Sequence, residues 1–188
     1  FKPEERAILC SRLNRLGGDI NLLYKDDWSE TKKTFEDWWN GELERPLIQI
    51  LSPRDKEPPS IDSWAFLRHH PNVDKALDEL FLQFSKTSFE REAYPNVWVN
   101  LGLGSLSAYL GADLKFDERV GTSWFLGKSP LSLLENAAYD PRNEWWRYTC
   151  HAYEVASQKC RNKAVVAITD LLDSVTVTGQ LRGSFPTT

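Results

Sequence analysis

Two acidic residues follow the apolar stretch 164–169 and are the first candidates for chemistry in this chain. Asp170 comes directly after that stretch, and Asp173 follows in the same polar segment. A carboxylate beyond the carboxyl end of a buried strand can bind a substrate amine, hold a metal or act as a general base. We predict a catalytic role for Asp170 and substrate binding by Asp173. The alternatives are an ion pair of Asp170 with a neighbouring arginine and a helix cap at Asp173.

A polar strand end with a glycine turn is the second candidate. Asn100 lies near the end of the predicted strand 97–101, and Gly102-Leu103-Gly104 follows it. Free N–H groups in such a turn can cradle an anionic group before a helix, so we predict that Asn100 and Gly102 bind substrate. The turn does not match the G-x-G-x-x-G dinucleotide fingerprint. The alternative is a tight turn that needs a positive φ angle.

An aromatic and a basic side chain complete the predicted substrate site. Trp124 lies near the end of the predicted strand 122–125, where it can stack on a flat ligand; packing in the fold is the alternative. Arg54 follows the predicted strand 47–51 and is placed to meet a carboxylated substrate. The alternative for Arg54 is a salt bridge within its loop, with Asp55 or Glu57.

The histidines and cysteines predict no metal centre. Adjacent residues on a helix point apart, so neither His69-His70 nor Cys150-His151 forms a shared site. Cys10, Cys150 and Cys160 are odd in number and lack C-x-x-C spacing. They are typical of reduced thiols, and we predict a cytoplasmic protein.

Four short apolar stretches must position these side chains. We expect strands at 47–51, 97–101, 122–125 and 164–169. The near-continuous apolar character of 164–169 indicates a strand covered on both faces, as in a parallel sheet. The predicted fold is therefore α/β, with the four strands as parallel neighbours in one sheet and the helices outside.

Helical spacing and helix-starting residues predict the other elements. Asp140-Pro141 resembles an N-cap followed by a first-turn proline. A further helix is expected after Asp173. The remaining predicted helices cover 2–16, 28–40, 63–70, 71–84, 106–110, 129–135 and 141–156.

Composition excludes two classes of partner. The 188 residues carry a net charge of −4 with no basic run, so we expect no binding to nucleic acid or to an anionic membrane. No apolar stretch approaches the roughly 18 residues that a membrane span needs. A length of 188 residues suits one core, and eight tryptophans are many for it.

Spaced sequence blocks, taken together, resemble the uroporphyrinogen decarboxylase-like superfamily, and most closely its bacterial branch. That group includes the haem-pathway decarboxylase and the corrinoid or coenzyme M methyltransferases. The blocks are FEDWWNGELERPLIQI (35–50), YPNVWVNLGLGSLSAYLGA (94–112), GTSWF (121–125), NEWWRY (143–148) and VAITDLLD with LRG (166–183).

The resemblance implies a partial (β/α)8 barrel. Residues 1–45 would be an N-terminal helical extension, and 46–188 would be the first half of the barrel. Half a barrel leaves open sheet edges, so we expect either a longer chain or a paired one, such as a homodimer. The side chains of Ser52, Arg54, Asn100, Trp124 and Asp170 should then line one concavity.

The implied activity is methyl transfer or decarboxylation on a small or corrinoid-linked substrate. The implied partners are a small-molecule substrate and, for a methyltransferase, a corrinoid protein. LIQILSPR stands where the decarboxylase has an arginine-rich motif, and the zinc ligands of the methyltransferases belong to the second half of the barrel. Neither a cofactor nor a metal is therefore specified. The alternative is a non-catalytic protein that binds ligands or associates through a tryptophan-rich surface.

Overall fold

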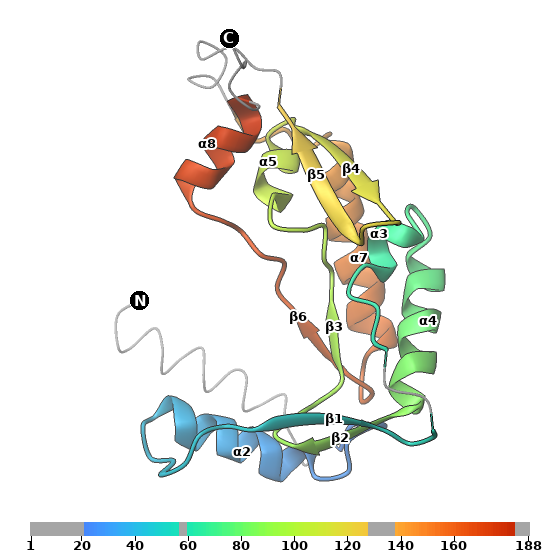
Figure 1. Cartoon of the computed structure of the whole chain (residues 1–188), viewed down its shortest axis with the longest axis vertical. Helices are drawn as coiled ribbons and strands as arrows, with labels where there is room; N and C mark the ends of the chain where they lie inside the picture. Colours follow the sequence, from blue (N-terminus) through green and yellow to red (C-terminus); the bar gives the residue numbers. More distant parts are fainter. Residues whose placement is uncertain (1–20, 57–59, 128–137, 183–188) are drawn as a thin grey trace.

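The computed structural model describes residues 21–56, 60–127 and 138–182. The predicted helices 2–16 and 129–135, together with Cys10, lie outside the described residues. Within the described part the chain is a mixed α/β protein with three two-stranded sheets (Figure 1). In chain order the elements are α2 (Trp28–Trp39), β1 (Gln49–Pro53), α3 (Ala65–Arg68), α4 (Val73–Ser85), β2 (Thr87–Arg91), β3 (Asn96–Trp98), α5 (Ser105–Tyr109), β4 (Asp113–Asp117), β5 (Thr122–Leu126), α7 (Glu144–Lys159), β6 (Val165–Ala167) and α8 (Ser174–Arg182).

The central pair of strands is parallel. β3 pairs with β6, and Val97 lies opposite Val166. Beyond the paired residues, the Thr169 hydroxyl donates a hydrogen bond to the Val99 carbonyl at 2.8 Å. The parallel pairing predicted for 97–101 and 164–169 is confirmed, and both strands present their carboxyl ends to the same side.

The prediction of one parallel sheet is wrong for the other two strands. β5 pairs antiparallel with β4, because the four residues 118–121 are too few for the crossover that parallel strands require. β1 pairs antiparallel with β2, and its residues are mostly exposed, unlike those of a strand buried on both faces. The described residues therefore form no closed barrel.

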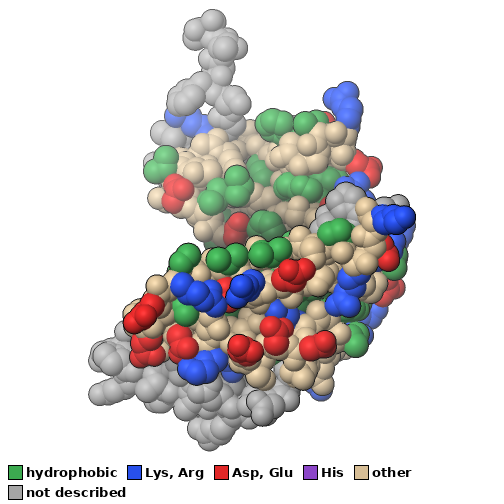
Figure 2. Space-filling view, turned by 60° about the horizontal axis from the view of Figure 1, so that its bottom comes forward, with side chains coloured by type: hydrophobic (Ala, Val, Ile, Leu, Met, Phe, Trp, Pro, Cys, Tyr) green, Lys and Arg blue, Asp and Glu red, His purple; other side chains and the backbone are tan. Residues whose placement is uncertain are grey.

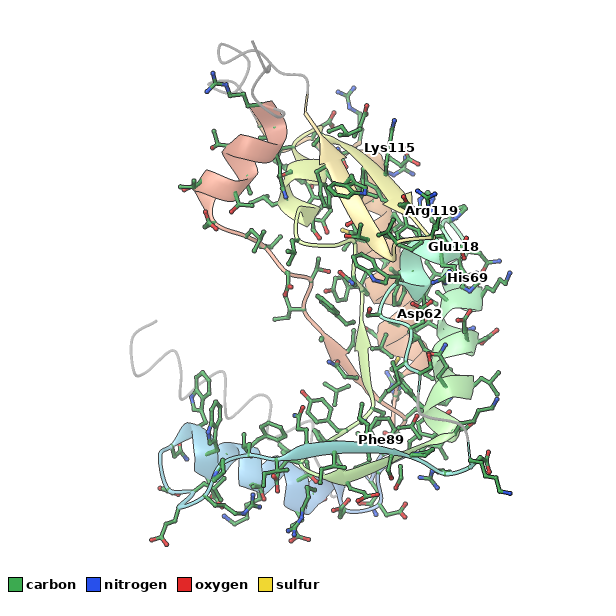
Figure 3. All side chains as sticks on the ribbon, in the orientation of Figure 1. Asp62, His69, Phe89, Lys115, Glu118 and Arg119 are labelled. Atoms are coloured by element: carbon green, nitrogen blue, oxygen red, sulfur yellow. The ribbon has the colours of Figure 1, made fainter. Side chains whose placement is uncertain are left out.

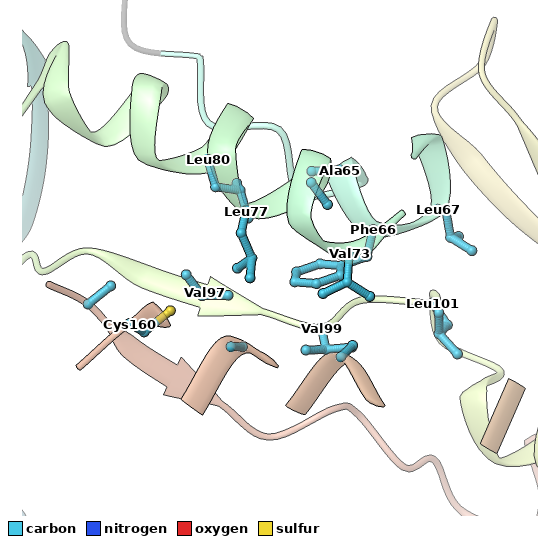
Figure 4. Close-up of a cluster of buried hydrophobic side chains, with 14 of the residues drawn as sticks. Ala65, Phe66, Leu67, Val73, Leu77, Leu80, Val97, Val99, Leu101 and Cys160 are labelled. Carbon is cyan, nitrogen blue, oxygen red and sulfur yellow. The ribbon is translucent and has the colours of Figure 1, made fainter. Parts of the chain in front are cut away.

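Helices α4 and α7 cover one face of the central strands. Figure 4 shows Phe66 and Leu77 beside Val97 of β3 and Val99, which follows β3, and all four are fully buried. Burial of such a side chain contributes about 1.5–3 kcal/mol. The helical spacing predicted for 71–84 is confirmed, since its buried residues are Val73, Ala76, Leu77, Leu80 and Phe84.

Helix α7 begins later than the sequence indicated. The Asn143 side chain caps it by accepting from the Trp146 N–H at 3.0 Å. Asp140 instead accepts from the Arg142 N–H in the preceding turn, at 2.9 Å. Asparagine is as good an N-cap as aspartate, so residue type alone does not decide between Asp140 and Asn143. The tertiary position of the turn decides which of them caps α7.

The described chain has an open side between its two ends. The β1–β2 sheet and α2 lie at one end, the β4–β5 sheet and α8 at the other, and β3 and β6 connect them (Figure 1). Figure 2 shows hydrophobic side chains along the hollow between these two parts, whereas charged side chains gather on the outer face of the β1–β2 end. No helix in the described segments is long and apolar enough to cross a membrane.

Candidate functional site

A cavity of about 430 Å³ lies at the carboxyl end of β3. This volume is in the range of small-molecule pockets. Strand β3, the glycine turn, β5, α8 and the loop before α3 all contribute to its wall. The lining residues are Ser63, Trp64, Trp98, Asn100, Gly102, Leu103, Thr122, Ser123, Trp124, Phe125 and Gln180.

Alternation along β3 places the cavity side chains. Val97 and Val99 are fully buried in the core, so Trp98 between them faces the other way and is half-buried at the cavity. Trp124 reaches the same cavity from β5 and is 57% exposed. The structure thus brings Asn100, Gly102 and Trp124 together, as the sequence predicted for a site at the strand ends.

Asn100 lines the cavity, but its amide is already engaged. Its Nδ2 donates to the Ser63 carbonyl at 3.1 Å, and its Oδ1 accepts from the Gly102 N–H at 2.7 Å. The side chain is buried, with 3% exposed. This geometry holds the strand end against the neighbouring loop, and it occupies the N–H that an anion would need.

The two glycines of the turn allow β5 to approach closely. Gly102 has a φ of +95°, and a Cβ there would lie 1.8 Å from the Ser123 hydroxyl oxygen. A Cβ at Gly104 would lie 2.4 Å from the Phe125 ring. A side chain at either position would clash with β5, and this steric requirement explains both glycines. It favours the tight-turn alternative over an anion-binding turn.

The cavity wall is aromatic, polar and uncharged. None of its lining residues is Asp, Glu, Lys, Arg or His. Within the described part of the chain, the indole N–H groups of Trp64, Trp98 and Trp124 donate no hydrogen bond. Every fully buried side-chain nitrogen or oxygen of the buried and half-buried residues there has a hydrogen-bond partner, so the indole nitrogens of the half-buried Trp64 and Trp98 are not fully buried. These donors are thus available to water or to a ligand.

Gln180 of α8 supplies a further polar group. Its Oε1 accepts from the Ser107 hydroxyl at 2.6 Å, which fixes the amide against α5. The Nε2 group donates no hydrogen bond within residues 21–56, 60–127 and 138–182. Gln180 therefore offers a positioned donor at the cavity wall.

The other predicted site residues lie elsewhere. Arg54 donates from Nε to the Thr87 carbonyl at 3.0 Å and ties the end of β1 to β2. Ser52 donates to Glu90 across the same strand pair. Asp170 is exposed after β6. None of the residues Ser52, Arg54 and Asp170 lines the cavity.

Asp173 is the N-terminal cap of α8. Its carboxylate accepts from the N–H groups of Val175 at 2.9 Å and Thr176 at 3.1 Å, and from the Thr176 hydroxyl at 3.0 Å. The hydrogen bonds from Thr176 lower the pKa of this carboxyl. This is the capping alternative that the sequence offered.

The paired histidines follow the end of α3 in a turn, not on the helix as predicted, and they contact different partners. His69 is in contact with Glu79, whereas the His70 ring packs on Trp145 and Tyr148 at centroid distances of 4.7 and 4.6 Å. Burial lowers the pKa of His70.

Neither of the two cysteines that the structure describes lines the cavity. Cys150 and the exposed His151 lie on α7, outside the cavity. Burial raises the pKa of the Cys160 thiol to about 11. Among the described side chains, no group of three or more His, Cys, Asp and Glu could hold a metal.

Trp64, Trp98 and Gln180 are among the eight lining residues that the sequence did not predict as site residues. The alternation of Trp98 with two valines was a usable signal, because it places the tryptophan on the face opposite the core. Gln180 carried no such signal, since its place depends on how α8 docks.

Comparison of the chain with protein-family models, with curated proteins and with solved structures finds no match. The fold and the site alone define the class: a mixed α/β protein with an uncharged, tryptophan-rich cavity at the end of a parallel strand pair.

Proposed function

We propose that this chain binds an uncharged, ring-containing small molecule in the tryptophan-lined cavity. We further propose that the parallel pair of β3 and β6 belongs to a (β/α)8-type enzyme. The observation that carries the proposal is the position of three tryptophans and no charged residue at the carboxyl end of β3. In α/β folds this end of the strands is where ligands bind.

The side chains that line the cavity indicate the chemistry of the proposed ligand. Indole rings stack on planar rings, and a stacked aromatic pair adds about 0.5–1.5 kcal/mol. The indole N–H groups, the Ser123 and Thr122 hydroxyls and the Gln180 amide suit the hydroxyl or carbonyl groups of a neutral ligand. A carboxylated ligand would lack a cationic partner among these residues.

Methyl transfer is the reaction class that we favour. The resemblance to uroporphyrinogen decarboxylase-like proteins supplies two classes, methyl transfer and decarboxylation. Decarboxylation needs a bound carboxylate, and Arg54, the cation predicted for it, lies outside the cavity. Transfer of a methyl group from a neutral ring substrate to a corrinoid carried by a partner protein fits the uncharged wall better.

Binding is tested with a matched pair of ligands in isothermal titration calorimetry at pH 7. Methyl 4-hydroxybenzoate is uncharged, and 4-hydroxybenzoate is its carboxylate counterpart. We expect the ester to bind at least tenfold more tightly than the acid. Trp124→Ala should weaken ester binding by about two- to tenfold, as expected for one lost stacking partner. Trp39→Ala is the control, because Trp39 is 71% exposed on α2 and lies outside the cavity.

Equal affinity for the ester and the acid, or no effect of Trp124→Ala, would contradict the proposed site. The reaction class is tested separately by incubating the chain with cob(I)alamin and methoxybenzene. Methylcobalamin and phenol are the products expected from methyl transfer. Release of CO₂ from 4-hydroxybenzoate would favour decarboxylation instead.

The second candidate is an association protein, and one observation favours it. Several large apolar side chains are well exposed, including Trp39 at 71%, Val175 at 80% and Ile168 at 85%. Exposed apolar surface is typical of protein contacts. If association is the function, Ile168→Asp should shift the oligomeric state in light scattering without changing ester binding.

A further inference from the structure

A second cavity, of about 350 Å³, lies beside the first along β3. It is bounded by the β1–β2 sheet, the end of α4 and the loop before α3. Figure 3 labels two of its lining residues, Asp62 in the loop before α3 and Phe89 on β2. Trp98 and Ser63 line both cavities, so the two cavities are neighbouring lobes that share part of their wall.

Aliphatic side chains contribute more lining residues to the second cavity than to the first. The wall of the second cavity includes the side chains of Leu51, Ile61, Leu80 and Phe89. Its one charged lining residue, Asp62, is already paired, since its carboxylate accepts from Arg68 Nε at 2.8 Å. No unpaired charge therefore faces a ligand there, and burial of hydrocarbon is the favourable interaction that this lobe offers.

We propose that the second cavity is a subsite for the hydrocarbon chain of the ligand whose ring binds in the first cavity. This inference rests on the proposed function, because it uses the ring site as its anchor. The ligand class is a neutral ring with an apolar side chain, which passes beside Trp98 from one lobe to the other. Ligands without the chain bind to the first lobe alone.

Strand β1 allows a sharp test of the subsite. Leu51 lies opposite the buried Phe89 in the β1–β2 register, and both residues line the cavity. Ile50 lies opposite the exposed Glu90 and does not line it. Successive residues of a strand point to opposite faces. Ile50 and Leu51 are similarly exposed, at 41% and 48%, so substitutions at the two positions are matched.

The experiment measures binding of the methyl, ethyl, propyl and butyl esters of 4-hydroxybenzoate to the full chain by calorimetry. We expect affinity to rise about three- to fourfold per added methylene in the wild-type chain. Leu51→Asp should remove most of that rise, whereas Ile50→Asp should keep it. Gln49→Glu, on the Leu51 side of the strand, is a second variant should Leu51→Asp fail to fold by circular dichroism.

Each outcome separates the subsite from the ring site. If the methyl ester does not bind, the proposed function and the subsite both fall. If the methyl ester binds but affinity stays flat along the series, the subsite is overturned and the ring site stands. Equal chain-length dependence in Leu51→Asp and Ile50→Asp would also overturn the subsite.

Discussion

The side-chain amide of Asn100 donates a hydrogen bond to the main-chain carbonyl of Ser63 at 3.1 Å. This bond ties the end of β3 to the loop whose residue Ser63 is shared by both cavities. Asn100 therefore shapes the wall of the site, and its amide oxygen is held by the Gly102 N–H. The structure gives Asn100 a positioning role where the sequence predicted a ligand contact.

Asn100→Ala should lower the free energy of unfolding by about 2–3 kcal/mol, because it leaves the Gly102 N–H and the Ser63 carbonyl without their partner. Asn96→Ala is the matched control, since Asn96 is an exposed residue of the same strand with no hydrogen bond from its side chain in the described part of the chain. Urea unfolding measures both. Similar stability of the two variants would contradict the positioning role.

Three glycine-to-alanine variants separate steric contact from backbone strain. Gly104→Ala tests steric contact without backbone strain, because a Cβ there would meet the Phe125 ring and the Gln180 amide oxygen; we expect a loss of about 1–3 kcal/mol. Gly111→Ala tests strain alone, because φ is +104° and nothing lies within 4 Å; about 1 kcal/mol is expected. Gly102→Ala combines both and should be the least stable in chemical unfolding. The account of a close turn fails if Gly111→Ala is the most destabilised.

Asp173→Ala should lower the thermal midpoint by a few degrees, because the cap of α8 is lost. Asp170→Asn should leave the midpoint unchanged, since Asp170 is exposed after β6.

If Asp170 is catalytic, its variant loses turnover in the cob(I)alamin assay while keeping ester affinity. Full turnover in Asp170→Asn would exclude that role.

Glu92 links the segment before β1 to β2 and gives a pH-dependent prediction. It accepts from both terminal nitrogens of Arg45, at 2.7 and 3.1 Å, and from the Ile48 N–H at 2.8 Å. The hydrogen bonds from Arg45 lower the pKa of Glu92 from 4.5 to about 2. A lowered pKa means that this carboxylate stabilises the fold at neutral pH, and that its contribution is lost as the pH falls from 4.5 to about 2.

Glu92→Gln should therefore cost about 1–3 kcal/mol at pH 7, and this difference from the wild type should disappear near pH 2. Unfolding in urea across this pH range measures it. Glu90→Gln, an exposed neighbour on β2, should change little at any pH. A difference for Glu92→Gln that does not depend on pH would contradict the ion pair.

Local patterns predicted the helices and one strand pair well. The apolar spacing of 71–84 matches the buried face of α4, and the apolar run 164–169 pairs in parallel with β3 as expected. The strands β2 and β4 were missed. The sequence DLKFD (113–117) alternates polar and apolar residues before a glycine turn, which is a usable hairpin signal. The sequence did not predict which strand pairs with β1. Its partner β2 follows α4 in the chain, and such a pairing depends on tertiary packing.

The candidate site was predicted in part. Asn100, Gly102 and Trp124 do meet at one cavity, because parallel strands share the direction of their carboxyl ends. Arg54 was predicted on the assumption that β1 is parallel to β3 in the same sheet. The antiparallel β1–β2 pairing instead directs Arg54 to the Thr87 carbonyl. Residue order alone does not show which sheet a strand joins.

The most direct test of the uncharged tryptophan-lined cavity is a ¹H–¹⁵N nuclear magnetic resonance titration of the indole N–H signals with methyl 4-hydroxybenzoate. The signals are assigned by single tryptophan-to-phenylalanine variants. We predict that the signals of Trp64, Trp98 and Trp124 shift together with one dissociation constant, while those of Trp28 and Trp39 stay in place. Shifts confined to Trp28 and Trp39, or no saturable shift at Trp124, would contradict the account.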